Sequence, residues 1–152
     1  MNPFDFSAAA LKTKKLDVPK FNSIDGLKNN IPNFRDVKEN RPLGGLYGEL
    51  KSSWRGYNMD AHHMPAASAN GLERNYGPAI IMERSDHRRT ASFGSSMEAK
   101  QYRAKQDALI KGNKFNNALN MDIQDIHAKF GSKYNIGIRQ MMDVCRSRGY
   151  IK

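Results

Sequence analysis

The sequence has a single cysteine among its 152 residues and lacks any long apolar run. One cysteine, Cys145, excludes an internal disulfide and a zinc site built on several cysteines. No stretch reaches the ~18 consecutive apolar residues of a membrane-spanning helix, so we expect no membrane insertion. The first ten residues lack both a basic start and a long apolar segment, so we also expect no ordinary signal peptide.

Acidic residues are the other shortage, because 25 lysines and arginines face 15 acidic residues, a formal net charge of +10. A charge of this sign points to a polyanionic partner: nucleic acid, an anionic membrane surface or an acidic protein. The excess lies mainly beyond residue 60, where residues 61–152 hold 15 basic and 8 acidic groups. No basic amphipathic segment with a strong aromatic face occurs, which disfavours the membrane surface.

The chain divides into three parts. Residues 1–42 are predicted to form an irregular arm, since four prolines and frequent Asn and Asp interrupt them. Residues 43–94 carry strand patterns at 44–51, at 59–63 and at 79–82, where a short apolar run suits a buried strand. A helical turn is expected directly after the last strand, capped by Ser85 or Asp86.

Residues 95–152 predict three helices that pack on the preceding part. A capping box at Ser95–Glu98 starts the first, which Gly112 ends. The second carries apolar residues in steps of four, four, three and four from Phe115 to Phe130. The third runs from Tyr134 through Cys145, and its apolar stripe predicts a buried, unreactive thiol. Together with the strands, these helices predict an α+β fold.

Three of the four histidines, His62, His63 and His87, lie within 26 residues. Neighbours on a strand point to opposite faces, so one imidazole of the adjacent pair can bind a metal while the other activates water. His87 follows a predicted strand at the place where a helix begins. The fourth, His127, stands alone on a predicted helix, and we expect a surface or packing role because one imidazole makes no metal site.

The order of strand, His-His, loop, strand and His on a helix resembles the HNH or His-Me finger nucleases, which are built on a ββα-metal motif. The residues that carry this resemblance are DAHHMP at 60–65, GPAIIM at 77–82 and DHRRT at 86–90. Within this family the chain is similar to the group that includes the DNase colicins and the C-terminal toxin domains of bacterial polymorphic toxins. The stretch from His62 to KFGSKY at 129–134 also resembles a domain found at the ends of such toxins.

The resemblance implies a ββα-metal nuclease core at 43–94 with a helical part at 95–152 packed on it. His63 is expected to be the general base that takes a proton from the attacking water. His62 and His87 are expected to bind one divalent cation, which neutralises the scissile phosphate and stabilises the leaving 3′ oxygen. Few imidazoles favour Mg²⁺, which keeps several waters, and Zn²⁺, Ni²⁺ and Mn²⁺ are the alternatives.

The sequence departs from the family pattern at two places. Many members carry another His one helical turn after the helix His, whereas this chain has Ala91. Thr90 and Asp86 are the candidates to help hold the metal, directly or through water. The family's middle Asn, which braces the base, has two candidate matches, Asn70 and Asn75.

Basic residues flank His87 and continue on the next helix, and as a cluster they suit contacts with nucleic-acid phosphates. These residues are Arg84, Arg88, Arg89, Lys100 and Arg103. Arg103 can also form a surface pair with Asp107 one turn later. Trp54, Tyr57 and Tyr76 can stack on bases, although core packing is an equal alternative for Trp54.

The expected function is therefore a metal-dependent endonuclease that hydrolyses DNA with little sequence specificity. The resemblance implies a bacterial toxin, delivered or secreted into the cytoplasm of a target cell and bound by an acidic immunity protein. Three alternatives stay open: an RNase on the same fold, a non-catalytic nucleic-acid-binding module, and an effector whose basic surface binds an acidic protein.

Overall fold

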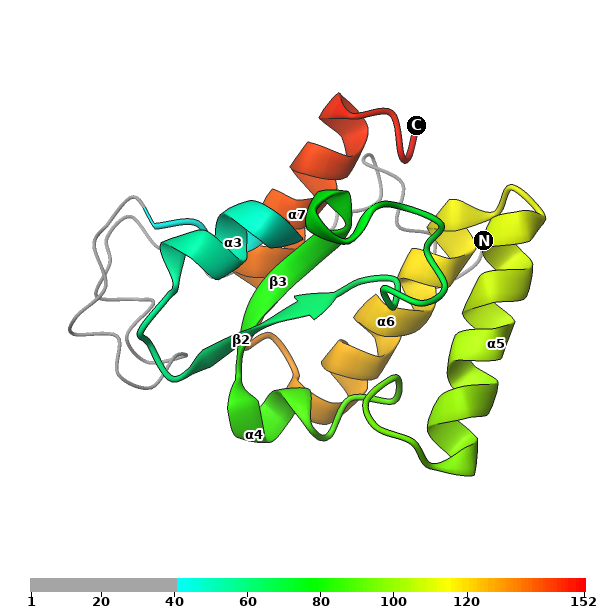
Figure 1. Cartoon of the computed structure of the whole chain (residues 1–152), viewed down its shortest axis with the longest axis horizontal. Coiled ribbons are helices and arrows are strands. Elements are labelled where there is room, and N and C mark those ends of the chain that lie inside the picture. The colour runs from blue at the N-terminus through cyan, green and yellow to red at the C-terminus, as the bar shows by residue number, and fades with distance from the viewer. Residues whose placement is uncertain (1–40) are drawn as a thin grey trace.

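The computed structural model describes residues 41–152 as a small antiparallel sheet with helices on both faces (Figure 1). Residues 1–40, nearly all of the predicted arm, lie outside the described residues. The sheet has three strands in the order β1-β3-β2, and the α+β class is confirmed. The elements are β1 (Gly44–Leu46), α3 (Tyr47–Ser53), β2 (Met59–His63), η2 (Arg74–Tyr76), β3 (Pro78–Glu83), α4 (Arg84–His87), α5 (Met97–Lys111), α6 (Phe115–Phe130) and α7 (Asn135–Ser147).

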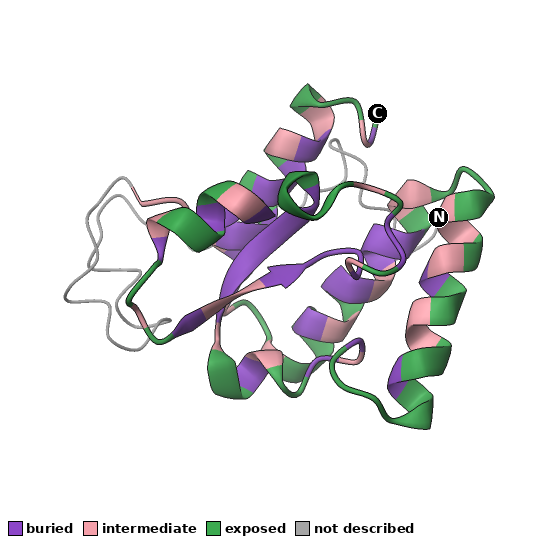
Figure 2. Cartoon of the chain, viewed as in Figure 1, coloured by how far each residue is buried: buried purple, intermediate pink, exposed green. Residues whose placement is uncertain are grey.

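Strand β3 lies in the middle of the sheet and is buried on both faces (Figure 2). Ala79 and Ile81 point to one face, where they join the side chains of α3 in a small cluster. Ile80 and Met82 point to the opposite face and join the main core. A continuous apolar run is what a strand covered on both faces needs, so the predicted buried strand is confirmed.

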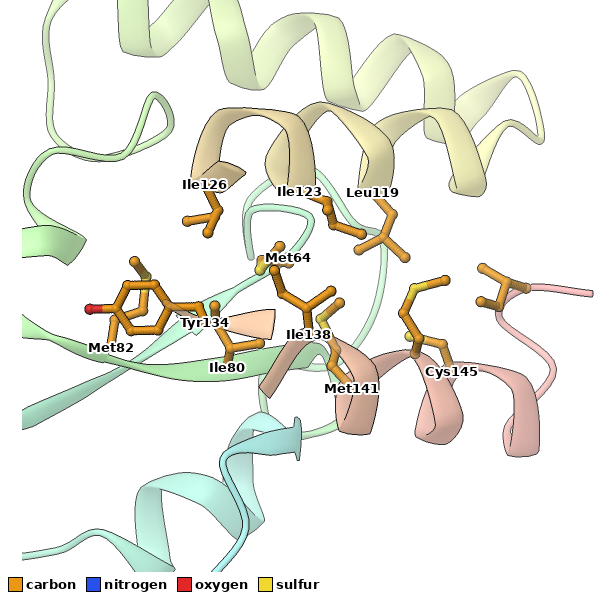
Figure 3. Close-up of a cluster of buried hydrophobic side chains, with 12 residues drawn as sticks. Met64, Ile80, Met82, Leu119, Ile123, Ile126, Tyr134, Ile138, Met141 and Cys145 are labelled. Atoms are coloured by element: carbon orange, nitrogen blue, oxygen red, sulfur yellow. The ribbon is translucent and has the colours of Figure 1, made fainter. Parts of the chain in front are cut away.

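The main core lies between the sheet and the helices α6 and α7 (Figure 3). Its fully buried members on α6 are Leu119, Ile123 and Ile126, as the helical spacing predicts. Helix α7 contributes Ile138, Met141, Met142 and Cys145, and burial raises the pKa of the Cys145 thiol to about 12. The three C-terminal helices are confirmed, and none of the helices between residues 41 and 152 combines the length and apolar character needed to cross a bilayer.

Strand β1 contacts helix α7 so closely that only glycine fits. A Cβ atom at Gly44 would lie 1.8 Å from the carbonyl oxygen of Gly137, and one at Gly137 would lie 2.7 Å from the carbonyl oxygen of Leu43. Gln140 Oε1 accepts hydrogen bonds from the Leu43 and Gly44 amides at 2.8 and 3.0 Å. The Gln140 side chain of α7 thus accepts hydrogen bonds from backbone amides at an edge of the sheet.

The predicted strand over 44–51 is wrong in its second half, because β1 ends at Leu46 and helix α3 begins at Tyr47. Tyr47, Leu50 and Trp54 are all buried against the sheet, and their spacing of three and four is that of a helix face. The interpretation of Trp54 as a core residue is confirmed, and its indole Nε1 donates to the Pro42 carbonyl at 2.6 Å.

Two predicted helix starts are also wrong in detail. Ser96, not Ser95, caps α5, and its Oγ accepts from the Ala99 amide at 3.1 Å. Helix α4 begins after Glu83 without a side-chain cap. Asp86 instead lies inside α4 and is buried, because residues distant in sequence supply its hydrogen-bond donors.

A buried polar network joins α5 to α6 and to the loop after β2. Asp122 accepts hydrogen bonds from Tyr102 Oη at 2.9 Å and from Gln106 Nε2 at 2.8 Å. Gln106 Oε1 in turn accepts from the Ala66 amide at 3.2 Å. Burial raises the pKa of Asp122 to about 7, and the charge of Asp125 adds to this, against the two hydrogen bonds. No apolar stripe predicts this network.

Candidate functional site

The three clustered histidines of the sequence come together at one edge of the sheet. His62 and His63 end the edge strand β2, and His87 ends helix α4, which directly follows the central strand. As alternation along a strand requires, the two neighbours contact different surroundings. The ring of His62 meets His87, whereas the ring of His63 stacks on Tyr47 of α3.

His62 and His87 form the closer pair, with ring centroids 5.0 Å apart and ring planes inclined by 58°. His62 is only 3% exposed. Burial lowers the pKa of His62 well below its ordinary value, and the charges of His87 and His63 act in the same direction. The His62 imidazole is therefore neutral at pH 7, which is the form that binds metals.

Asp60 holds His87 in place. Its Oδ2 lies 2.9 Å from His87 Nδ1, and its Oδ1 accepts from Arg84 Nε at 3.1 Å. Because a carboxylate accepts hydrogen bonds, we assign the His87 proton to Nδ1, which leaves the Nε2 lone pair for a ligand. Sequence reasoning missed Asp60 as a site residue, although its place two residues before His62 puts it on the same strand face.

His63 is fixed by two contacts from different elements. Its ring stacks on Tyr47 with centroids 4.0 Å apart, and its Nε2 lies 2.9 Å from the Arg74 carbonyl oxygen. A carbonyl only accepts, so Nε2 carries the proton and Nδ1 keeps a lone pair. Burial lowers the pKa of His63; the charges of Arg74 and His87 add to this, and the hydrogen bond to the Arg74 carbonyl opposes it.

Close packing around Gly77 places Asn70 beside His63. A Cβ atom at Gly77 would lie 2.7 Å from the His63 ring and 3.0 Å from Asn70 Nδ2. Asn70 is buried, donates to the Pro65 carbonyl and accepts from the Leu72 amide, so it braces the loop that follows His63. Asn75 is exposed, and its side chain packs against Gly48 of α3 instead.

The two candidates for a further metal ligand are engaged elsewhere. Asp86 accepts from Lys133 Nζ at 2.7 Å and from Tyr134 Oη at 2.6 Å. These bonds and the nearby cations lower the pKa of Asp86 against the opposing effect of its burial. The Thr90 hydroxyl donates to the backbone carbonyl of His87 at 2.8 Å, which secures the end of α4.

The predicted phosphate-binding residues differ in their exposure to solvent. Arg84, Arg88 and Arg89 of the α4 region are exposed, as is Lys100 on α5. Arg89 also lies over the Phe130 ring, 5.0 Å from its centroid.

Arg103 has a different environment, because its Nη1 donates to the Ser92 and Gly94 carbonyls at 2.6 and 2.8 Å. The predicted Arg103–Asp107 pair is therefore wrong. Asp107 instead pairs with Lys111 at 2.7 Å.

Three other residues named from the sequence each have contacts of their own. His127 is exposed, and its Nε2 lies 2.7 Å from Asn135 Oδ1 at the start of α7, so the expected surface or packing role agrees with its contacts. Tyr76 is exposed, with the guanidinium of Arg148 over its ring. Tyr57 is partly buried and packs on the cluster under α3.

The donor set suits a cation bound by two imidazoles. Within residues 41–152 no group of three His, Cys, Asp or Glu side chains is placed to hold a metal ion. His62 and the Nε2 of His87 could supply two donors, with Asp60 behind the second. The further positions of such a cation would belong to water, as in a hydrated divalent cation.

Comparisons with models of known protein families, with curated proteins and with solved structures find no match to this chain.

Proposed function

We propose that this protein is a metal-dependent endonuclease of the ββα-metal type that hydrolyses DNA with little sequence specificity. The observation that carries the proposal is the pairing of His62 with His87 at 5.0 Å, with the fixed imidazole of His63 at the neighbouring position. Phosphodiester hydrolysis needs a base that is unprotonated at neutral pH and a sink for negative charge. The neutral His63 imidazole supplies the first, and a cation held by His62 and His87 would supply the second.

His63 is the general base of the proposed reaction. The hydrogen bond from Nε2 to the Arg74 carbonyl and the stack on Tyr47 hold the ring in one tautomer and one orientation. With its pKa lowered, His63 is neutral at pH 7, and Nδ1 can accept a proton from water. The water oxygen then bonds to phosphorus while the bond from phosphorus to the leaving 3′ oxygen breaks.

His62 and His87 would hold the divalent cation, with Mg²⁺ as the first candidate and Zn²⁺, Ni²⁺ and Mn²⁺ as alternatives. When bound, the cation supplies charge neutralisation at the phosphate and at the leaving oxygen. Asp60 orients His87 through Nδ1 and keeps Nε2 available. A carboxylate behind a metal-binding His also raises the basicity of the imidazole.

Arg84 and Arg88 are the side chains that we assign to phosphate contacts, since both are exposed on or directly after α4. Arg89 and Lys100 extend this basic surface. Arg103 contributes to this basic surface indirectly, because its side chain holds the loop between α4 and α5. Backbone contacts of this kind bind without reading the base sequence, in agreement with the proposed low specificity.

The biological setting that fits this activity is a delivered bacterial toxin. We propose that it acts in the cytoplasm of a target cell and that an acidic immunity protein covers the basic surface in the producing cell. The net charge of +10 supports such a partner as well as nucleic acid.

The test is cleavage of supercoiled plasmid with Mg²⁺, Mn²⁺, Ni²⁺ or Zn²⁺. The wild type should nick and linearise the plasmid with at least one metal, and His63→Ala should lose about 100-fold or more of the rate. His127→Ala is the matched control and should cut normally, because His127 bonds Asn135 of α7 and is not one of the three site histidines.

Equal cutting by His63→Ala would remove His63 from the role of base. The same assay with RNA separates a DNase from an RNase. Salt-sensitive binding with no turnover in any metal would support the non-catalytic binding module instead.

A further inference from the structure

An aromatic side chain stands exposed beside the histidine pair. Phe93 is 42% exposed, and its ring centroid lies 5.1 Å from that of His87. The two rings are inclined by 74°, so His87 covers only part of the Phe93 ring. Single exposed apolar residues are normal on protein surfaces, so the exposure gains meaning only from the way this residue is held.

The loop between α4 and α5 holds Phe93 from both sides. Arg103 donates to the carbonyl before Phe93 and to the carbonyl after it, at 2.6 and 2.8 Å. The Phe93 amide donates to the Thr90 carbonyl at 3.2 Å, and Asp125 Oδ2 accepts from the Ala91 amide at 2.7 Å. Side chains of α5 and α6 therefore fix the loop before any ligand arrives, which lowers the entropy lost when the ring binds something.

The surroundings of the ring indicate what it binds. His87 contacts the ring, Arg84 bonds the same Asp60 carboxylate that bonds His87, and the exposed Arg88 follows His87 in the chain. An apolar ring next to cationic side chains matches a nucleotide, which joins a flat aromatic base to an anionic phosphate. If a phosphate binds at His87, the base next to it comes within reach of the Phe93 ring.

We propose that Phe93 is a stacking platform for an unpaired nucleobase that flanks the scissile phosphate. This inference rests on the proposed function, because it places the scissile phosphate at His87. Stacking on an aromatic ring tolerates every base, so it adds affinity without sequence preference. It requires an unstacked base, so the site favours single-stranded or locally opened nucleic acid.

Binding of short single-stranded oligonucleotides by the full chain in the presence of a chelator tests the proposal without chemistry. Two ligands of equal length and charge are compared: oligodeoxyadenylate and the abasic strand of the same length. Phe93→Ala should weaken binding of the base-bearing strand by about 5- to 150-fold and leave the abasic strand unaffected. Phe93→Tyr should bind both strands as the wild type does.

Three further variants complete the design. Phe93→Leu keeps an apolar side chain against His87 but has no aromatic face, so it should weaken binding of the base-bearing strand. It tests the proposal even if Phe93→Ala folds poorly. Met97→Ala removes another exposed apolar side chain and should change neither affinity. Arg88→Gln should weaken both strands alike and reduce the salt dependence of binding.

The proposal is overturned if Phe93→Ala and Phe93→Leu show the same ratio of affinities for the two strands as the wild type. It is also overturned if the wild type binds the abasic strand as tightly as the base-bearing strand. Plasmid cleavage by the wild type reports the proposed function separately. Cleavage without a Phe93 effect removes only the platform. If Phe93 affects binding of the base-bearing strand but no metal supports cleavage, the stacking proposal stands and the proposed nuclease function is wrong.

Discussion

Replacing Asp122 by Asn should abolish a loss of stability that the wild type undergoes between about pH 4 and pH 7. Asp122 is 1% exposed and its pKa is raised to about 7, because burial penalises the charged form. An acid whose pKa is raised by folding binds its proton more tightly in the folded state. Its contribution is therefore complete below the unfolded pKa of about 3.8 and is lost as the pH rises through about 7.

The size of the effect follows from the two pKa values. Each pH unit between them costs about 1.4 kcal/mol of unfolding free energy when one proton separates the two states. Across this window the loss is on the order of 4 kcal/mol. At Asp122→Asn the amide oxygen can still accept from Gln106 Nε2, and the amide nitrogen can donate to Tyr102 Oη, which then accepts where it donates to the wild-type carboxylate. Asp122→Asn should therefore keep the network and exceed the wild type in stability at pH 8.

The assay is urea unfolding of both proteins at several pH values from 4 to 8. The quantity compared is the difference in unfolding free energy between wild type and variant at each pH. Folding lowers the pKa of His62 and of His63, so their contribution to the stability of the protein is lost as the pH falls below about 6.5. Because both proteins contain these histidines, the comparison cancels their contribution. Gln101→Ala, which replaces an exposed side chain of α5 that does not ionise, is the control and should show no such trend.

A difference between wild type and Asp122→Asn that stays constant from pH 4 to pH 8 would refute this reasoning. It would mean that the hydrogen bonds from Tyr102 and Gln106 keep Asp122 ionised despite its burial.

Three more outcomes follow from the packing and the site. Gly44→Ala should lower the unfolding free energy by about 1–3 kcal/mol in urea unfolding, because its Cβ would meet the Gly137 carbonyl; unchanged stability would contradict the close contact of β1 with α7. Asp60→Asn should weaken divalent-metal binding about 10- to 100-fold by calorimetry, and equal affinity would separate Asp60 from the cation. Cys145 should resist a thiol reagent until the protein unfolds, since its pKa is raised to about 12; fast labelling of the native protein would show an accessible thiol.

Several elements could be predicted from the sequence because their pattern is local and repeated. The apolar steps of four, four, three and four predict α6 with its ends at Phe115 and Phe130, as observed. The apolar run at 79–82 predicts a buried strand, and Gly112 marks the end of α5. Helix α3 was missed because three residues of strand precede it, and alternation over so short a segment fits a strand or a helix.

The site divides in the same way. The residue types and their order single out His62, His63 and His87, and the structure places the first and last of these 5.0 Å apart. The carboxylate behind His87 and the carbonyl behind His63 come from other segments, at Asp60 and Arg74. A local pattern holds no information on which distant acceptor a ring nitrogen meets.

The sequence by itself determined the basic charge, the α+β class and the histidines that form the candidate site, because these depend on composition and short-range periodicity. Only the tertiary structure decided the partners of Asp86 and Arg103 and the exposed position of Phe93. The physical reason is that a polar side chain takes the donors and acceptors that the packed helices bring to it, and chain folding alone sets which these are.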